Sequence, residues 1–480
     1  MDELQIPRQK FGGRPFIRGK MIPAVQIGFF RKFSASNILL AATTTLMVIK
    51  MKAVILAAGL GTRMRPLTFT KPKFLLPVAG KPALDHVISL LRNAGVDRIA
   101  MVVGFGKDQI MERYGDGSAF GVRLEYLHQK ELLGTANAVS LAEDFVGGER
   151  FVVMNGDTLV DQESLNAFMA RYRELSGRKN FSCLMGTIEV EDPAQFGIVF
   201  VEGDQVKEIV EKPKRVKSRL ANAGIYLFDP KVFDAIRRTK KSKRGEYEIT
   251  SSIQMMIDEG GEVFISPLEL WADIGRPWDL LLANEYFLRN LKGEIHGKIE
   301  HGVYIESNVY VGEGTRIRSG SYIEGPTYIG RNCDIGPNCF IRPSTSVGDH
   351  VRIGNGVEIK NSIIMDHTNV AHLSYVGDSI IGSRCNLGAG TTIANLRLDE
   401  SAVKMKVSGR IVNTGRKKLG TVIGDDVKTG VNSMINPGVK IGPNAAVGPG
   451  AVVYEDVQPN TLVIAKPIIK KHKWPRKIEW

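Results

Sequence analysis

The chain has 480 residues, of which 43% are hydrophobic and 24% are charged. This length predicts two or three domains, and the apolar content is ample for folded cores. The longest apolar run, from Ile38 to Ile49, is too short to span a bilayer, so no membrane association is expected.

The net charge of +13 is uneven, with basic residues concentrated near both ends of the chain. Nucleic-acid binding is one interpretation; anionic substrates together with two solvated basic ends are the other. We favour the second, because no nucleic-acid motif with interleaved aromatic residues is present. Four cysteines without a CxxC pair indicate a reducing, cytoplasmic environment.

The two ends are expected to lie outside the folded domains. Residues 1–50 are Arg-rich and could be read as a targeting peptide. We interpret them as a disordered extension or the result of a mis-assigned start, because Met51 begins the first predicted strand directly. Residues 460–480 are interpreted as a basic C-terminal tail.

Residues 51–292 alternate strands and helices. Apolar runs predict strands at 51–56, 98–103, 123–127 and 151–154, and helical spacing predicts helices at 83–94 and from 135. Glu202-Gly203-Asp204 between two apolar runs predicts a hairpin, and a helix over 277–291 closes the domain. This pattern indicates an α/β, Rossmann-like fold with ligands beyond the carboxyl ends of the strands.

The stretch from Leu56 to Pro82 carries the strongest chemical signal. The first strand runs into Gly59-Leu60-Gly61-Thr62, and cations follow at Arg63 and Lys73. Glycines after a strand let backbone N–H groups approach a phosphate, and fixed positive charges suit a triphosphate. Taken alone, the glycines would fit a bare turn better than a phosphate site. Neither the P-loop ending nor the full Rossmann spacing is present.

From about Val303 the pattern changes to a hexad repeat. Aliphatic residues recur every sixth position: Ile305, Val311, Ile317, Ile323, Ile329, Ile335, Ile341, Val347, Ile353 and Ile359. Such hexads predict a parallel β-helix over residues 303–459. A second column, mostly of small residues, follows four positions later and includes Cys333, Cys339 and Cys385, which favours packing over metal ligation. The register is expected to slip over 365–381.

Residues 394–420 interrupt the repeat. This insertion ends in Arg416, Lys417 and Lys418, and it is expected to project from the β-helix as a basic loop.

The stretch from Leu56 to Pro82 resembles the signature of sugar-1-phosphate nucleotidylyltransferases. That resemblance, which covers residues 51–291, implies that Arg63 and Lys73 grip the nucleoside triphosphate. It implies nucleotide contacts from Leu56, Ala57, Ala58, Gly59, Gly61, Thr62, Gln129, Gly134 and Thr135. Asp157 and Asp273 would hold Mg²⁺, in agreement with the preference of Mg²⁺ for carboxylates and phosphate oxygens. Sugar-binding residues would be Gly197, Glu211, Lys212 and Asn222.

Residues 371–378 and 386–395 resemble the acetyltransferase half of the bifunctional glucosamine-1-phosphate acetyltransferase and N-acetylglucosamine-1-phosphate uridylyltransferase. The resemblance implies a left-handed β-helix in which His372 acts as general base. A backbone N–H near Ala389 would stabilise the oxyanion. The other substrate-binding residues would be Arg342, Glu358, Lys360, Tyr375, Asn386 and Asn395. The insertion is similar to that of archaeal enzymes, whose acceptor can be glucosamine or galactosamine phosphate.

These observations predict a bifunctional transferase that makes UDP-N-acetylhexosamine from hexosamine-1-phosphate, acetyl-CoA and UTP. The alternative is a nucleotidylyltransferase for UTP or dTTP with a non-catalytic β-helix. A scaffold or regulatory subunit is disfavoured, because it would not need Arg63, Lys73, Asp157 and Asp273. The hexapeptide resemblance also implies a homotrimer, or a multiple of one, with acetyl sites between subunits.

Overall fold

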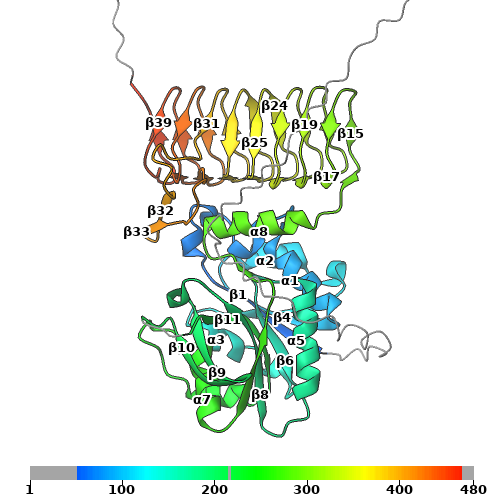
Figure 1. Cartoon of the computed structure of the whole chain (residues 1–480), viewed down its shortest axis with the longest axis vertical. Coiled ribbons are helices and arrows are strands. Elements are labelled where there is room, and N and C mark those ends of the chain that lie inside the picture. Colours follow the sequence, from blue (N-terminus) through cyan, green and yellow to red (C-terminus); the bar gives the residue numbers. More distant parts are fainter. Residues whose placement is uncertain (1–50, 215–217, 467–480) are drawn as a thin grey trace, which may run out of the picture.

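The computed structural model describes residues 51–214 and 218–466, so the predictions for residues 1–50 and 467–480 lie outside it. An α/β domain and a parallel β-helix are stacked on each other, with helix α8 (Pro277–Arg289) lying along the β-helix (Figure 1). Within the described residues, no helix is both long enough and apolar enough to cross a membrane.

A nine-stranded sheet forms the centre of the first domain. Its order is β5 (Arg123–His128), β4 (Val96–Val103), β1 (Met51–Ala57), β6 (Phe151–Asn155), β11 (Leu220–Phe228), β8 (Phe181–Glu189), β12 (Glu262–Pro267), β10 (Gln205–Glu211) and β9 (Gly197–Glu202). The first four strands are parallel, and β11 is antiparallel to both β6 and β8. The predicted strands and the β9–β10 hairpin are confirmed.

Helices cover both faces of this sheet because successive residues of a strand point to opposite sides. In β1, Ala53 and Ile55 face one core while Val54 and Leu56 face the other. The first core is covered by α1 (Ala83–Asn93), α2 (Lys107–Tyr114) and α5 (Gln162–Leu175). The second is covered by α3 (Thr135–Ser140), α4 (Glu143–Val146), α6 (Val232–Arg238) and α7 (Ile249–Asp258). Two small ribbons complete the domain: β2 (Pro77–Val78) with β3 (Lys81–Pro82), and β7 (Thr158–Leu159) with β13 (Ala272–Asp273).

The second domain is a left-handed parallel β-helix with three sheets. The first sheet comprises β14 (Glu294–Ile295), β17 (Val309–Val311), β20 (Thr327–Ile329), β23 (Thr345–Val347), β26 (Ile363–Ile364), β29 (Ile380–Ile381), β34 (Val422–Ile423) and β37 (Lys440–Ile441). The second comprises β15 (Lys298–Ile299), β18 (Arg316–Ile317), β21 (Asp334–Ile335), β24 (Arg352–Asn355), β27 (Asn369–His372), β30 (Asn386–Leu387), β35 (Lys428–Thr429), β38 (Ala446–Val447) and β40 (Leu462–Val463). The third comprises β16 (Tyr304–Ile305), β19 (Tyr322–Ile323), β22 (Phe340–Ile341), β25 (Glu358–Lys360), β28 (Tyr375–Gly377), β31 (Thr392–Ile393), β36 (Met434–Ile435) and β39 (Val452–Val453).

The predicted slip of the hexad register is confirmed, and it takes the form of a pair of shortened coils. Val347 pairs with Ile364 and Ile364 with Ile381, so each of these coils is one residue shorter than the coils before it. Val370 and Val376 therefore keep their inward positions. Ile363, which the hexad count placed inward, faces out of the β-helix and joins the core shared with the first domain. The three β-helix cysteines are buried, as the packing interpretation predicts.

The insertion does not project as a basic loop, so that prediction is wrong. It forms an antiparallel hairpin of β32 (Lys404–Val407) and β33 (Arg410–Asn413) that reaches back toward the α/β domain (Figure 1). Apolar residues alternate along β32, and Met405 and Val407 are buried in the core that the two domains share. This alternation gives the hairpin an apolar face, whose burial favours packing over projection into solvent.

The two domains meet over the outer face of the first sheet. Asn284 of α8 is fully buried there: its Oδ1 accepts hydrogen bonds from Ala79 N (2.8 Å) and Ser346 Oγ (2.7 Å). Its Nδ2 donates to Ser344 O at 3.1 Å. Lys71 forms an ion pair with the buried Asp425, with Nζ 3.1 Å from Oδ1. These polar groups are paired across the junction, which fixes the relative position of the domains.

Candidate active sites

The glycine loop follows β1 as predicted. Leu56, Ala57 and Ala58 are buried, while Gly59 and Thr62 are exposed. Gly61 has a φ of 61°, and a Cβ atom there would lie 3.1 Å from the Cβ of Lys73. Glycine is therefore favoured both by backbone conformation and by the close approach of Lys73.

Two carboxylates from distant segments converge beside this loop. Asp157 follows β6, Asp273 lies on β13, and the pairing of β7 with β13 places Asp273 opposite Thr158. The Lys73 ammonium forms an ion pair with the Asp157 carboxylate. Burial, followed by the negative charge of Asp157, raises the pKa of Asp273 to about 6. Mutual repulsion of two close carboxylates is relieved by a cation.

The guanidinium of Arg63 also lies near Asp273. A Cβ atom on Gly275 would be 3.0 Å from Asp273 Oδ2 and 3.3 Å from Arg63 Nη2, so both groups approach the same glycine. The described residues contain no group of three or more His, Cys, Asp or Glu side chains that could hold a metal. A pair of carboxylates is nevertheless sufficient for Mg²⁺ that also binds phosphate oxygens, so the residues present fit this ion.

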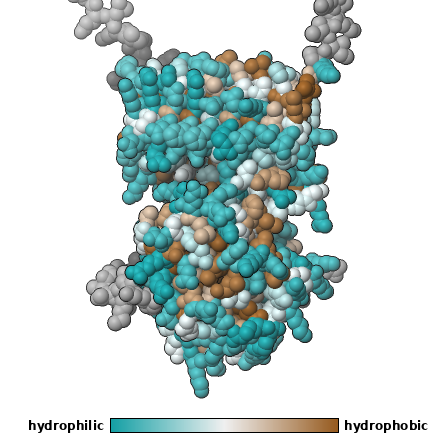
Figure 2. Space-filling view, turned by 180° about the vertical axis from the view of Figure 1, so that it is seen from behind, coloured by the Kyte–Doolittle hydropathy of each residue, from teal (hydrophilic) through white to brown (hydrophobic). Residues whose placement is uncertain are grey.

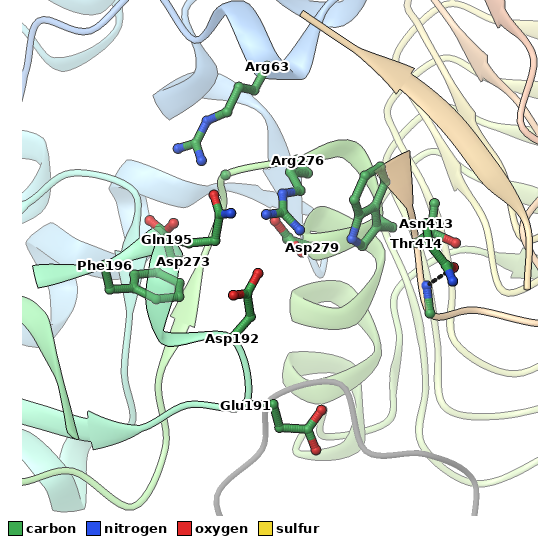
Figure 3. A pocket seen from close by; sticks show the side chains of 13 residues that line it. Arg63, Glu191, Asp192, Gln195, Phe196, Asp273, Arg276, Asp279, Asn413 and Thr414 are labelled. Carbon is green, nitrogen blue, oxygen red and sulfur yellow. Dashed lines mark hydrogen bonds between the residues drawn. The ribbon is translucent and has the colours of Figure 1, made fainter. Parts of the chain in front are cut away.

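A cavity of about 210 Å³ opens between these charged groups (Figure 3). Arg63, Asp273 and Asp279 line it from the α/β domain, and Asn413 and Thr414 line it from the insertion hairpin. Burial, followed by the charge of Asp273, raises the pKa of Asp279 to about 7. Asp279 was not among the predicted site residues, although its place in the first turn of the predicted helix 277–291, shortly after Asp273, was a usable signal.

The predicted nucleotide contacts Gln129, Gly134 and Thr135 lie near the junction of α3 and α7. Gln129 is buried, and its Nε2 donates hydrogen bonds to Gly134 O at 3.2 Å and to Asn137 Oδ1 at 2.8 Å. Thr135 Oγ1 accepts a hydrogen bond from Ile249 N at 3.0 Å. The Thr135 hydroxyl thus holds the first turn of α7, in addition to any role toward a ligand.

The four predicted sugar-binding residues come together. A Cβ atom on Gly197 would lie 3.1 Å from Glu211 Oε2 and 3.7 Å from Asn222 Cβ. Lys212 follows Glu211 with a φ of 42°. Burial and the nearby charges of Arg244 and Arg63 lower the pKa of Lys212. Phe196, next to Gly197, and Arg63 line the same cavity, so the sugar segment and the glycine loop border one site.

Most of the predicted acetyl-transfer residues lie on the third sheet. Glu358 pairs with Tyr375 in the ladder, and Arg342 Nη1 is 3.0 Å from Glu358 Oε1. Lys360 Nζ is 3.0 Å from Asp378 Oδ2, and Asn395 donates hydrogen bonds to Asp378 and to Tyr375 Oη. Asp378 is 2% exposed and has a φ of 48°. It orients two predicted substrate-binding residues, and the sequence analysis gave it no role.

The remaining acetyl-transfer residues lie on neighbouring surfaces. His372 is the last residue of β27 on the second sheet. The carbonyl of His372 accepts a hydrogen bond from Gly390 N at 3.2 Å. Ala389, which precedes Gly390, therefore lies at the same corner as His372 on the next coil. His372 is exposed, and its imidazole forms no hydrogen bond with another described residue. Asn386 pairs with Asn369 on the second sheet and does not join the predicted residues around Tyr375 on the third sheet.

A chain of polar contacts joins the third-sheet residues to helix α8. Asn361 Nδ2 donates to Asp378 Oδ1 at 2.8 Å and to Glu285 Oε1 at 2.9 Å. Arg416 Nη2 of the insertion donates to the same Glu285 oxygen at 2.7 Å. Arg416 is thus committed to an interdomain ion pair, whereas Lys417 and Lys418 are exposed.

Three family models match the chain. A nucleotidyl transferase family matches residues 52–290, the C-terminal domain of GMPPB matches residues 323–436, and bacterial transferase hexapeptide repeats match residues 420–455. The matches follow the division of the chain into an α/β domain and a β-helix.

Similar proteins span nearly the whole described chain. A bifunctional protein GlmU from Methanocaldococcus jannaschii is 41% identical over 86% of this chain and 97% of its own length. A GlmU from Methanococcus vannielii is 40% identical over 88% of this chain and 100% of its own. A bifunctional sugar-1-phosphate nucleotidylyltransferase/acetyltransferase from Sulfurisphaera tokodaii is 37% identical over 85% and 98%. With both domains matched end to end at this level of identity, the chain belongs to the GlmU family of bifunctional proteins.

Proposed function

We propose that this bifunctional enzyme makes a UDP-N-acetylhexosamine in two steps. The first transfers an acetyl group from acetyl-CoA to the amine of a hexosamine-1-phosphate, and the second transfers a uridylyl group from UTP to the acetylated product. The observation that carries the proposal is the convergence of Arg63, Lys73, Asp157 and Asp273 in one domain of a chain whose second domain presents the His372 and Tyr375 groups.

In nucleotidyl transfer, an oxygen of the sugar phosphate attacks the α-phosphorus of UTP in line with the departing pyrophosphate. Gly197, Glu211, Lys212 and Asn222 position the sugar phosphate, while Arg63 and Lys73 neutralise the charge of the triphosphate. Asp157 and Asp273 would hold Mg²⁺, which when bound supplies charge neutralisation at the phosphate oxygens. No covalent intermediate with the enzyme is required.

In acetyl transfer, the sugar amine attacks the thioester carbonyl and the thiolate of coenzyme A departs. His372 Nδ1 or Nε2 takes a proton from the amine, and a backbone N–H near Ala389 stabilises the oxyanion. Arg342 and Lys360 suit the phosphate of the acceptor because both are cations on one sheet face. Glu358 orients Arg342, and Asp378 orients Lys360, while Asn395 donates a hydrogen bond to Tyr375.

We further propose that the chain assembles as a homotrimer, or a multiple of one, with acetyl sites between subunits. His372 lies on an open surface, so a second chain is needed to enclose a substrate there. Exposed apolar side chains also gather over the last coils of the β-helix (Figure 2), among them Met434, Tyr454, Leu462 and Ile464. Light scattering that gives a monomer still active in acetylation would contradict this arrangement.

The deciding experiment supplies purified full-length protein with acetyl-CoA and either glucosamine-1-phosphate or galactosamine-1-phosphate. Thiol release reports acetylation. Pyrophosphate release, with UTP or dTTP and the ready-made N-acetylhexosamine-1-phosphate, reports nucleotidyl transfer. We expect both signals. Comparing the rates with the two acceptors and with the two nucleotides ranks the substrate specificity of each step.

The match of residues 323–436 to the C-terminal domain of GMPPB favours one alternative. In it, the β-helix is non-catalytic and only assembles or regulates the nucleotidylyltransferase. Pyrophosphate release without any thiol release on either hexosamine phosphate would establish that alternative.

A further inference from the structure

A second cavity, of about 440 Å³, also borders Arg63. The glycine loop contributes Thr62, Arg63 and Arg65 to its wall, and the insertion hairpin contributes Lys406, Ser408 and Gly409. The last coils of the β-helix close it with Lys440, Gly442 and the segment 456–459. The cavity is therefore built by both domains together.

The side chains of this cavity carry an excess of positive charge. Lys440 is paired with Asp456, whose Oδ2 is 3.4 Å from Nζ. Within the described residues, no carboxylate lies within ion-pair distance of Arg63, Arg65 or Lys406. The Arg65 guanidinium lies over the Phe69 ring, 4.7 Å from its centroid, which orients it. Several cations in a concave site favour a ligand with several negative charges.

Lys406 is directed into this cavity by the alternation of strand β32. Met405 and Val407 on either side of it are buried against the first domain, so Lys406 must point to the opposite face. Lys404, two residues earlier, is exposed on the same face but does not line the cavity.

The two cavities beside Arg63 differ in what borders them. The first contains Asp273 together with Asp192 and Phe196 next to the predicted sugar segment, whereas the second contains none of these residues. In an in-line phosphoryl displacement the attacking and departing oxygens lie on opposite sides of the phosphorus. The first cavity, which borders the sugar segment, therefore suits the attacking sugar phosphate, and the second, which borders the glycine loop without those residues, suits the departing group.

We propose that the second cavity binds pyrophosphate, and that Lys406, supplied by the insertion of the β-helix domain, binds it together with Arg65. This inference rests on the nucleotidyl transfer proposed above. The bond from the α-phosphorus to the sugar-phosphate oxygen forms while the bond to the bridging oxygen breaks, and pyrophosphate departs with that electron pair. The acetyltransferase domain thereby contributes a residue to the nucleotidyl-transfer site.

The test measures binding of inorganic pyrophosphate to the full-length protein by titration calorimetry with Mg²⁺ present. Lys406→Met and Arg65→Met should each weaken binding by about five- to tenfold, the size of one lost charge-assisted contact at a partly exposed site. Lys406→Arg should retain binding within about twofold. Lys404→Met is the matched control and should bind as wild type does, and thermal unfolding should show that all variants fold alike.

Unchanged affinity in both Lys406→Met and Arg65→Met would overturn the assignment, and so would an equal loss in Lys404→Met, which would indicate a general charge effect. Loss of acetyl-CoA binding in Lys406→Met with pyrophosphate binding intact would assign the cavity to the coenzyme instead. Because calorimetry needs no turnover, a protein that binds pyrophosphate normally yet transfers no nucleotide would refute the proposed function and not this site.

Discussion

The two candidate sites differ in how much of each a single chain encloses. Arg63 and Asp273 line cavities between the α/β domain and the insertion hairpin, and Asp157 is 6% exposed. The acetyl-transfer residues lie on the outer surfaces of the β-helix, where His372 is exposed. A concave, partly dry site strengthens charge interactions, whereas an open surface leaves them screened by water.

In our proposal the nucleotidyl site is complete within one chain, whereas the acetyl site needs a further covering surface. The two are nevertheless joined physically. Helix α8 begins beside the first cavity with Asp279 and contacts the acetyl-transfer group through Glu285 and Asn361. Substitutions in each site should show whether the two activities are separable and how far this connection couples them.

The largest expected effect is on acetylation in His372→Ala. Loss of a general base typically costs about 10² to 10⁴ in rate, so thiol release should fall by that factor while pyrophosphate release stays near wild type. Because the imidazole has no hydrogen-bonding partner among the described residues, the substitution should leave folding unchanged. His301→Ala, elsewhere on the β-helix, is the control. Retained acetylation would show that His372 is not the base.

Asp157→Asn should produce the converse result. It removes the carboxylate that pairs with Lys73 and that, with Asp273, is proposed to hold Mg²⁺. Removing one electrostatic group from a transition-state site costs about 10² to 10³ in rate, so pyrophosphate release should fall by that factor and thiol release should persist. Asp161→Asn, at the start of α5, is the control. Undiminished pyrophosphate release would refute the metal-site assignment, and a parallel loss of both activities would contradict their independence.

Asp378→Asn tests the polar chain between the sites. It breaks the ion pair with Lys360, and hydrogen bonds to charged groups contribute about 1.5 to 3 kcal/mol. Acetylation should fall by roughly tenfold to a hundredfold, mainly through the KM for the hexosamine phosphate. Asp334→Asn, which breaks an ion pair with Arg318 outside the site, should change neither activity. An unchanged KM would show that Asp378 serves the fold alone.

The smallest expected effect is on stability in Asn284→Ala. The substitution leaves buried hydrogen-bonding groups at Ala79, Ser344 and Ser346 without their partner, at a cost of about 1 to 3 kcal/mol. Calorimetric unfolding should show a Tm several degrees lower, with both activities retained at 25 °C. Asn166→Ala on the exposed face of α5 should shift the free energy of unfolding by less than about 0.5 kcal/mol. An unchanged Tm would mean that the domains are held by their apolar contacts alone.

Much of the architecture could be read from local pattern. The apolar runs of β1, β4 and β6, the β9–β10 turn and the hexad column of the β-helix are repeats or runs within short windows, so side-chain type and spacing specify them. The resemblance of the segments around Arg63, Asp157, Asp273 and His372 to known families named the residues of both sites. The structure brings the first three of these together and leaves His372 at an open corner.

Other features depended on contacts between segments far apart in the chain. The hexad count located the slip over 365–381. Only the pairing with the coils on either side, however, shows that Val370 stays inside and that Ile363 turns outward. The alternation of apolar and polar residues over 403–407 was visible in the sequence. The surface of the first domain that the apolar residues cover was not. Only the docking of the hairpin on the first domain places Lys406 beside the glycine loop and pairs Arg416 with Glu285.

The sequence by itself determined the two folds and the residues that can carry out chemistry, because backbone conformation and side-chain reactivity are set within a few neighbouring positions. The tertiary structure decided which of those residues share an environment. It raised the pKa of Asp273 through burial and the charge of Asp157, made Asp378 the partner of both Lys360 and Asn395, and placed the insertion hairpin beside the glycine loop. Burial and charge proximity depend on which surfaces pack together, and no window of sequence contains both surfaces.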